Sequence, residues 1–159
     1  MSEFTENTKE NPGVITLPPF IYLAGLIAGI ALDFLYPLSF IPSPLSHYIG
    51  WPLIALAIGL VNYGVKTMRA AGTHEDVRRP DTALVTGGPF RYSRNPLYIS
   101  LTVTYCAIAI LVRTLWPLLL LPIVMAFMHS GVILREERHL ERVFGEDYLR
   151  YKARVRRWL

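Results

Sequence analysis

The segment Leu84–Tyr98, LVTGGPFRYSRNPLY, is the one around which the rest of this chain is predicted to be organised. It holds two glycines, two prolines, two arginines and three aromatic residues, and a long apolar run begins at its end. Gly87-Gly88-Pro89 predicts a turn, because glycine admits positive φ and proline fixes its own φ. Asn95-Pro96 predicts a second turn or a helix entry, since proline suits the first helical position. We expect the aromatic faces and cations between them to line a pocket for a flat, polar ligand at a membrane edge.

The composition predicts a single domain embedded in a membrane. The chain has 159 residues, of which 52% are hydrophobic and 18% charged, and its mean hydropathy is +0.34. The apolar residues form long uncharged runs without helical or strand spacing, which indicates that lipid is their solvent. The net charge of +4 comes from cations that flank these runs, where the positive-inside rule accounts for them. Nucleic acid is therefore not expected as a partner.

Four apolar runs predict an all-α integral membrane protein with about four transmembrane helices. They are about Leu17–Leu38, Ile49–Met68, Leu97–Val112 and Leu115–Leu134. A helix of about twenty apolar residues crosses the hydrocarbon core of a bilayer. Only Arg113-Thr114 separates the last two runs, which predicts an antiparallel helical hairpin. Phe40–His47 contains two prolines and no formal charge, and predicts a loop on the non-cytoplasmic side.

The distribution of charge predicts the topology. We divide the domain into a polar tail (1–16), two transmembrane helices (17–68) and a C-terminal core (69–159). The connection Ala70–Pro96 is rich in arginine, and the chain from Arg135 onward carries eight Arg or Lys against five acids. The positive-inside rule places both segments in the cytoplasm, and four spans place both termini there. Asp33, the one charge of the first span, is either an interfacial carboxylate or a functional acid.

The polar C-terminal part is predicted to be helical. The last span should continue through Arg135–Arg142, which contains many helix formers and no breaker. Gly145 predicts the end of this helix through a left-handed cap. Beyond it, Tyr148, Tyr151 and Val155 recur at i, i+3 and i+7. This spacing predicts a short amphipathic helix, which we expect to lie at the headgroup surface.

Two acids where the last span leaves the membrane are the main candidates for binding. Glu136 and Glu137 are either a solvated, charge-laced helix end or ligands for a cation or for hydroxyl groups. A sulfonium with an ammonium group, or ribose hydroxyls, would suit them. A metal site is not expected, because the four histidines are scattered over different segments. The one cysteine, Cys106, excludes an internal disulfide and is expected to be a packed thiol.

Three segments in order carry a family resemblance. They are Leu84–Tyr98, the hairpin Leu97–Leu134, and Arg135–Val155 with the sequence REERHLERVFGEDYLRYKARV. Together they resemble the isoprenylcysteine carboxyl methyltransferase and phospholipid methyltransferase family, small integral membrane enzymes that use S-adenosylmethionine. The likeness covers roughly Ala71–Trp158. It implies methyl transfer to a lipophilic small molecule, a lipid or a prenylcysteine-like acceptor, in a bacterial or archaeal cell membrane with a cytoplasmic active site.

The resemblance also implies which residues form the site. The family pocket is built from the loop before the hairpin, an Arg-(His or Asn)-Pro-x-Tyr motif and the acidic helix, so residues 69–159 would be the cofactor-binding catalytic core. The residues that would bind the cofactor are Thr82, Ala83, Leu84, Val85, Phe90, Asn95, Pro96, Leu97, Tyr98, Glu136 and Glu137. The expected catalytic residues are Arg94, Arg135 and Glu136. In the prenylcysteine enzymes a substrate-binding arginine lies about one helical turn before the acidic run, where this chain has Val132 and Ile133. Arg94 or Arg135 would take its place. Asn95 cannot titrate, so we do not expect it to act as a general base.

Two other functions stay open. One is an NADPH-dependent membrane reductase, because sterol reductases share a similar C-terminal membrane fold. Asn95-Pro96-Leu97-Tyr98 lacks the order of residues by which the reductases resemble one another. The other is a catalytically silent membrane scaffold, against which the intact Asn95, Tyr98 and paired glutamates argue.

Overall fold

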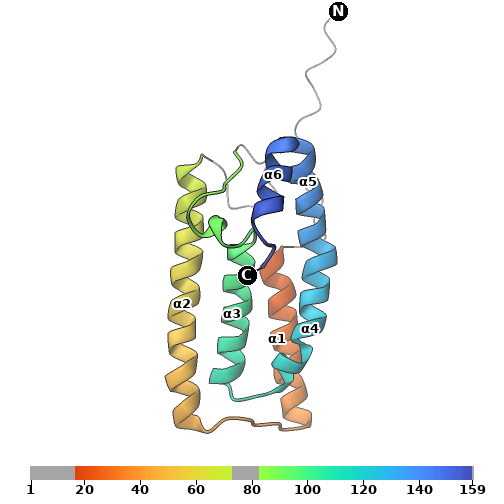
Figure 1. Cartoon of the computed structure of the whole chain (residues 1–159). Coiled ribbons are helices and arrows are strands. Elements are labelled where there is room, and N and C mark those ends of the chain that lie inside the picture. The colour runs from red at the N-terminus through yellow and green to blue at the C-terminus, as the bar shows by residue number, and fades with distance from the viewer. Residues whose placement is uncertain (1–16, 73–82, 159) are drawn as a thin grey trace, which may run out of the picture.

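Apolar helices running up and down form the body of the protein in the computed structural model, which describes residues 17–72 and 83–158 (Figure 1). They are α1 (Pro18–Leu35), α2 (Ser43–Ala70), α3 (Pro96–Leu111) and α4 (Trp116–Met128). A π-helical turn, His129–Ile133, joins α4 to α5 (Leu134–Phe144), and α6 (Glu146–Arg154) folds back from there. A short 3-10 helix, Gly88–Arg91, lies in the loop before α3. The all-α prediction is confirmed.

In the described part of the chain, three helices are long and apolar enough to cross a membrane. They are α1 with 18 residues, α2 with 28, and the continuous helix Trp116–Phe144 with 29. The third apolar helix along the chain, α3, is shorter at 16 residues. Four complete spans therefore remain a prediction.

The second helix begins earlier than the sequence predicts. Phe40–His47 was expected to be a loop, but α2 begins at Ser43, within that segment. Pro44 is in the first turn of the helix, where a backbone N–H has no intrahelical partner, so proline removes no hydrogen bond there. Proline in this segment marks a helix start, and the expectation of a loop through His47 was wrong.

Small residues let α2 pack closely against α3. Gly50, Ala57 and Gly64 recur every seven residues and are buried. A Cβ atom added to Gly50 would lie 2.5 Å from Leu111, and one added to Gly64 would lie 2.7 Å from Leu97. Gly50, near the start of α2, lies against Leu111 at the end of α3, and Gly64 lies against Leu97 at its start. The two helices are therefore antiparallel.

A second close pair is formed by α1 and α4. Gly25 and Gly29 are one helical turn apart in α1, in the small-xxx-small spacing that allows helix backbones to approach in membranes. A Cβ atom on Gly29 would lie 2.7 Å from the backbone nitrogen of Pro117. Each arm of the predicted hairpin therefore packs mainly on another helix, α3 on α2 and α4 on α1.

The apolar core lies where α1, α3 and α4 meet. Its buried members are Tyr22, Leu26, Tyr98, Tyr105, Val124, Met128, Val132 and Ile133. The rings of Tyr22 and Tyr105 pack edge to face with centroids 6.0 Å apart. Their hydroxyls are also satisfied, since Tyr22 bonds to Thr102 at 2.8 Å and Tyr105 donates to the Pro117 carbonyl at 2.7 Å.

Two short connections close one end of the bundle. The Asp33 carboxylate accepts hydrogen bonds from the Thr114 hydroxyl at 2.7 Å and from the Leu38 amide at 2.9 Å. The Leu115 amide in turn donates to the Leu38 carbonyl at 3.0 Å. Asp33 thus ties the α1–α2 connection to the hairpin turn, which accounts for an acid near the end of an apolar helix.

The polar segments gather at the opposite end, where the loop before α3, α5 and α6 lie together (Figure 1). Gly145 separates α5 from α6 with φ of 51° and ψ of −124°, a conformation open to glycine alone. The predicted helix end is there, although ψ differs from that of a left-handed cap. Tyr148 and Tyr151 of α6 are 1% and 5% exposed. The amphipathic helix therefore buries its tyrosine face against protein, whereas the sequence led us to expect the headgroup surface.

Candidate functional site

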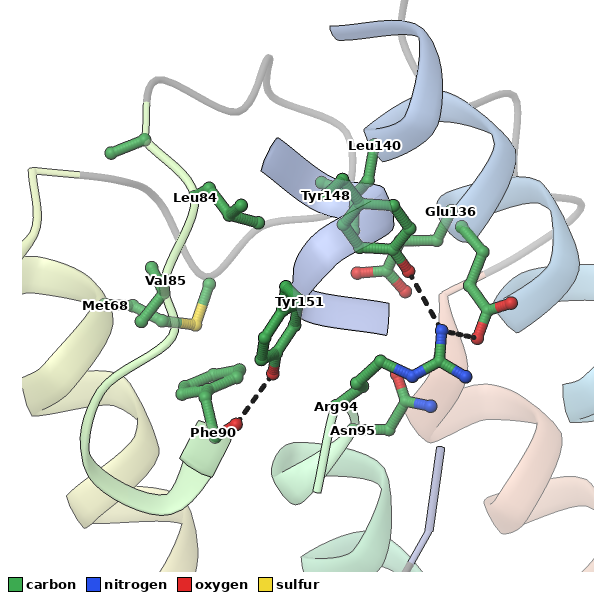
Figure 2. A pocket seen from close by; sticks show the side chains of 12 residues that line it. Met68, Leu84, Val85, Phe90, Arg94, Asn95, Glu136, Leu140, Tyr148 and Tyr151 are labelled. Atoms are coloured by element: carbon green, nitrogen blue, oxygen red, sulfur yellow. Dashed lines mark hydrogen bonds and ion pairs between the residues drawn. The ribbon is translucent and has the colours of Figure 1, made fainter. Parts of the chain in front are cut away.

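A pocket opens at the polar end between the loop before α3 and the helices α5 and α6 (Figure 2). The residues that line it are Met68, Ala83, Leu84, Val85, Phe90, Arg94, Asn95, Glu136, Glu137, Leu140, Tyr148 and Tyr151. The empty space between them is about 520 Å³, open solvent at the mouth included. Segments more than forty positions apart in sequence thus face one another across one cavity, with aromatic and aliphatic surfaces around a few charged groups.

Most of the predicted site residues lie together here. Ala83, Leu84, Val85, Phe90, Arg94, Asn95, Glu136 and Glu137 all line the pocket, and Thr82 lies outside the described residues. Tyr98 does not line the pocket but hydrogen-bonds to a residue that does. Pro96 is fully buried, Leu97 packs toward Gly64 of α2, and Arg135 is not among the lining residues.

The glycine turn before α3 sets the shape of the loop. Gly88 has a φ of 54°, and a Cβ atom there would lie 2.5 Å from the Thr67 hydroxyl of α2. Both the backbone conformation and the space therefore require glycine. The following 3-10 turn presents the Phe90 carbonyl, which accepts a hydrogen bond from the Tyr151 hydroxyl at 2.8 Å. This bond joins the loop to α6 across the pocket.

Tyr98 and Glu136 connect α3 to α5. The Tyr98 hydroxyl donates to Glu136 Oε2 at 2.7 Å, a charge-assisted bond, and the ring of Tyr98 is buried in the core. Glu136 also lines the pocket, and a carboxylate can accept several hydrogen bonds at once. The α3 motif therefore holds one of the two acids in place.

Arg94 and Glu137 form the charged wall of the pocket. Arg94 Nη1 lies 3.1 Å from Glu137 Oε1, and both side chains are over nine-tenths buried. The same Nη1 donates to the Tyr148 hydroxyl at 3.4 Å, so Figure 2 shows Arg94 between a tyrosine and a carboxylate. Among the described residues, Arg94 Nε is buried with no hydrogen-bond partner. An unpaired buried donor costs free energy, which an acceptor supplied by a ligand would recover.

A second arginine reaches Glu137 from the C-terminal end. Arg157 donates through Nε to Oε1 and through Nη2 to Oε2, both at 2.8 Å, in a bidentate pair. Its Nη1 lies 3.5 Å from Nδ1 of His129 in the π-helical turn. The hydrogen bond to Glu137 raises the pKa of Arg157, so the guanidinium stays charged.

The tyrosines of α6 stay neutral at physiological pH. Burial, followed by the negative charge of Glu137, raises the pKa of Tyr148 to about 12. Burial likewise raises the pKa of Tyr151, helped by the neighbouring Tyr148. Because both phenols hold their protons tightly, they serve as hydrogen-bonding walls and are poorly suited to act as bases.

Several pocket residues were not predicted as site residues. Its lining also includes Met68, Leu140, Tyr148 and Tyr151. Arg157 does not line the pocket but hydrogen-bonds to Glu137, which does. The tyrosine spacing in α6 signalled a buried face, but not what covers that face. Arg157 carried no signal, because it is one of eight cations in the basic C-terminal part.

Comparison with known proteins connects this geometry to a family. Residues 45–147 match the model of the phospholipid methyltransferase family, which is more than half of the chain. An uncharacterized protein of Haemophilus influenzae is 63% identical over 27 residues, which is 17% of this chain and 43% of that protein, so the match spans less than half the length of this relative. No solved structure matches the chain. The predicted resemblance is confirmed: the chain belongs to the phospholipid methyltransferase family.

Proposed function

We propose that this protein transfers a methyl group from S-adenosylmethionine to a lipophilic acceptor held in the membrane. One observation carries the proposal: the pocket joins Leu84–Asn95 to the acids of α5 at the polar end of an apolar helix bundle. Membership of a methyltransferase family supports the reaction class. Three helices of membrane-spanning length support the membrane setting.

The residues of the pocket fit S-adenosylmethionine. Phe90, Tyr148 and Tyr151 offer aromatic surfaces for the adenine ring. Glu136 would accept hydrogen bonds from ribose hydroxyls or from the ammonium group. The unpaired Nε of Arg94 calls for an acceptor such as the carboxylate of the methionine part or of the methyl acceptor.

Methyl transfer requires the protein mainly to bind and orient the two reactants. When bound, S-adenosylmethionine supplies an activated methyl group on a positively charged sulfur. The task of the chain is to hold the nucleophile in line with that methyl group and to exclude water. The tyrosines keep their protons and Asn95 cannot titrate, so the pocket favours an acceptor that is already nucleophilic, such as a carboxylate.

Ligand binding to the detergent-purified protein tests the donor. Calorimetry with S-adenosylmethionine, S-adenosylhomocysteine and NADPH should show binding of the first two only. Binding of NADPH alone would favour a reductase, and binding of none would favour a scaffold. Lipid extracts incubated with the protein and radiolabelled S-adenosylmethionine should then yield label in the organic phase. A Glu136→Gln variant, which removes the charge beside Tyr98, should lose this label.

A further inference from the structure

The chain beyond α6 does not stay at the surface but returns into the bundle. The Arg156 carbonyl accepts a hydrogen bond from the Arg94 amide at 2.9 Å. The Arg157 carbonyl accepts from Ser93 Oγ and from Asn95 Nδ2, both at 3.1 Å. Trp158 packs against the core cluster. The C-terminal tail, Val155–Trp158, therefore binds the segment before α3 through these hydrogen bonds. It lies beyond residue 147, where the match to the family model ends.

Arg157 and Arg94 compete for one carboxylate, and Arg157 takes the stronger position. Arginine and carboxylate groups favour a parallel, bidentate pair. Arg157 makes that pair with both oxygens of Glu137, whereas Arg94 contacts only Oε1, through Nη1. Without Arg157, Arg94 would be free to take the bidentate position. It would then turn its donors toward Glu137 and away from the pocket.

Asn95 is oriented by the same tail. Because its partner is the Arg157 carbonyl, which can only accept, the bonded atom must be the amide nitrogen Nδ2. This leaves the Oδ1 atom as the side-chain group that Asn95 can offer to a ligand. The backbone N–H of Asn95 is also held in place, since it donates to Ser93 Oγ at 3.1 Å.

We propose that Arg157 is a positioning residue of the methyl-donor pocket, which holds Glu137 in a bidentate pair and so keeps Arg94 available to the ligand. Arg157 does not line the pocket, so it acts through Glu137 and Arg94 and not by contact with the donor. This inference rests on the proposed function. It adds to that function a residue that lies outside the part of the chain matched by the family model.

The test compares three variants of the full-length protein in detergent. Arg157→Gln removes the guanidinium, and Arg157→Lys keeps the charge but cannot form the fork. Arg156→Gln is the matched control, because it removes the same charge from the neighbouring, exposed position. Calorimetry with S-adenosylhomocysteine gives the affinity. Hydrogen exchange of the Arg94 amide reports whether the tail stays docked, since this amide donates to the Arg156 carbonyl.

We expect Arg157→Gln to raise the Kd for S-adenosylhomocysteine about 10- to 100-fold, in line with the loss of a charged hydrogen-bonded pair. Arg157→Lys should give a smaller rise, and Arg156→Gln should stay within about twofold. The Arg94 amide should remain protected in all three, because the carbonyl bonds and Trp158 hold the tail. Adding Glu137→Gln to Arg157→Gln should cost less than the sum of the two changes, since the residues form one unit.

Two results would overturn the inference while the proposed function stands. One is an unchanged Kd in Arg157→Gln. The other is a loss of affinity that occurs only together with a loss of Arg94 amide protection, because the cause would then be an undocked tail. A wild-type protein that binds no S-adenosylhomocysteine would instead overturn the proposed function, and this inference with it.

Discussion

Arg157 and Glu137 lie twenty residues apart in sequence, and their side chains form two parallel hydrogen bonds of 2.8 Å. Arg94 approaches the same carboxylate from the loop before α3 at 3.1 Å. One acid of α5 thus joins three segments: the helix that leaves the apolar bundle, the loop before α3 and the C-terminal tail. The charged wall of the pocket is one connected unit, so a change in any member affects the others.

This arrangement predicts that Glu137 contributes to stability as well as to the site. Glu137→Ala leaves two guanidinium groups facing each other without their shared carboxylate. We expect a loss of about 3 kcal/mol, at the lower end of the range for breaking a buried pair, because the Arg157 side chain is 27% exposed. The melting temperature in detergent measures it.

The matched control is Glu141→Ala, which breaks the ion pair with Lys152, whose two side chains are about one third exposed. It should cost no more than about 1 kcal/mol, as is usual for surface pairs. Equal losses for the two variants would show that the Glu137 pair has no special role in the fold.

A second prediction concerns the bond between Tyr98 and Glu136. Tyr98→Phe keeps the buried ring but removes the hydroxyl that donates to Glu136 Oε2 at 2.7 Å. We expect a stability loss of about 1–2 kcal/mol and a roughly tenfold weaker affinity for S-adenosylhomocysteine, since the carboxylate loses its fixed orientation. Calorimetry and thermal unfolding on the same sample separate the two effects.

Tyr105→Phe offers the control within the same helix. It removes a buried hydroxyl that donates to the Pro117 carbonyl at 2.7 Å, and it lies about two helical turns beyond Tyr98 in α3. Its stability should fall by a similar amount while its affinity stays at the wild-type value. If both variants lose affinity alike, general loosening of α3 is responsible and Tyr98 has no specific role in the site.

The sequence predicted the helices well, because uncharged runs long enough to cross a bilayer leave few alternatives to a helix. The end of α5 was also predictable, since Gly145 adopts a conformation that other residues avoid. The start of α2 was not, because Pro44 signals a loop and a first helical turn equally well. The π-helical turn at His129–Ile133 likewise has no sequence rule that would have revealed it.

The candidate site was predictable where residues close together in the sequence indicate it. The glycine turn and the paired acids were found from the local sequence, the role of Asn95 was implied by the family resemblance, and all lie at or beside one pocket. What escaped prediction depends on long-range packing. Periodicity in α6 shows that Tyr148 and Tyr151 share a buried face, but it cannot say whether lipid or protein covers it. In the sequence Arg157 cannot be told apart from Arg156 or the other cations of the C-terminal part. Only the fold of the tail, which brings Arg157 to Glu137, distinguishes it.

The third prediction tests the close approach of α1 and α4 with a pair of glycines. Gly29→Ala places a Cβ atom 2.7 Å from the Pro117 backbone nitrogen and 2.8 Å from its Cα, and backbone atoms cannot move aside as a flexible side chain can. We expect a loss of about 1–3 kcal/mol from overpacking, seen as a lower melting temperature in detergent.

Gly59→Ala is the control, because nothing lies within 4 Å of its added Cβ atom and the site is exposed on α2. That variant should be neutral or gain up to about 1 kcal/mol, since alanine favours a helix interior over glycine. Equal melting temperatures for the two variants would mean that α1 and α4 are farther apart than this packing requires.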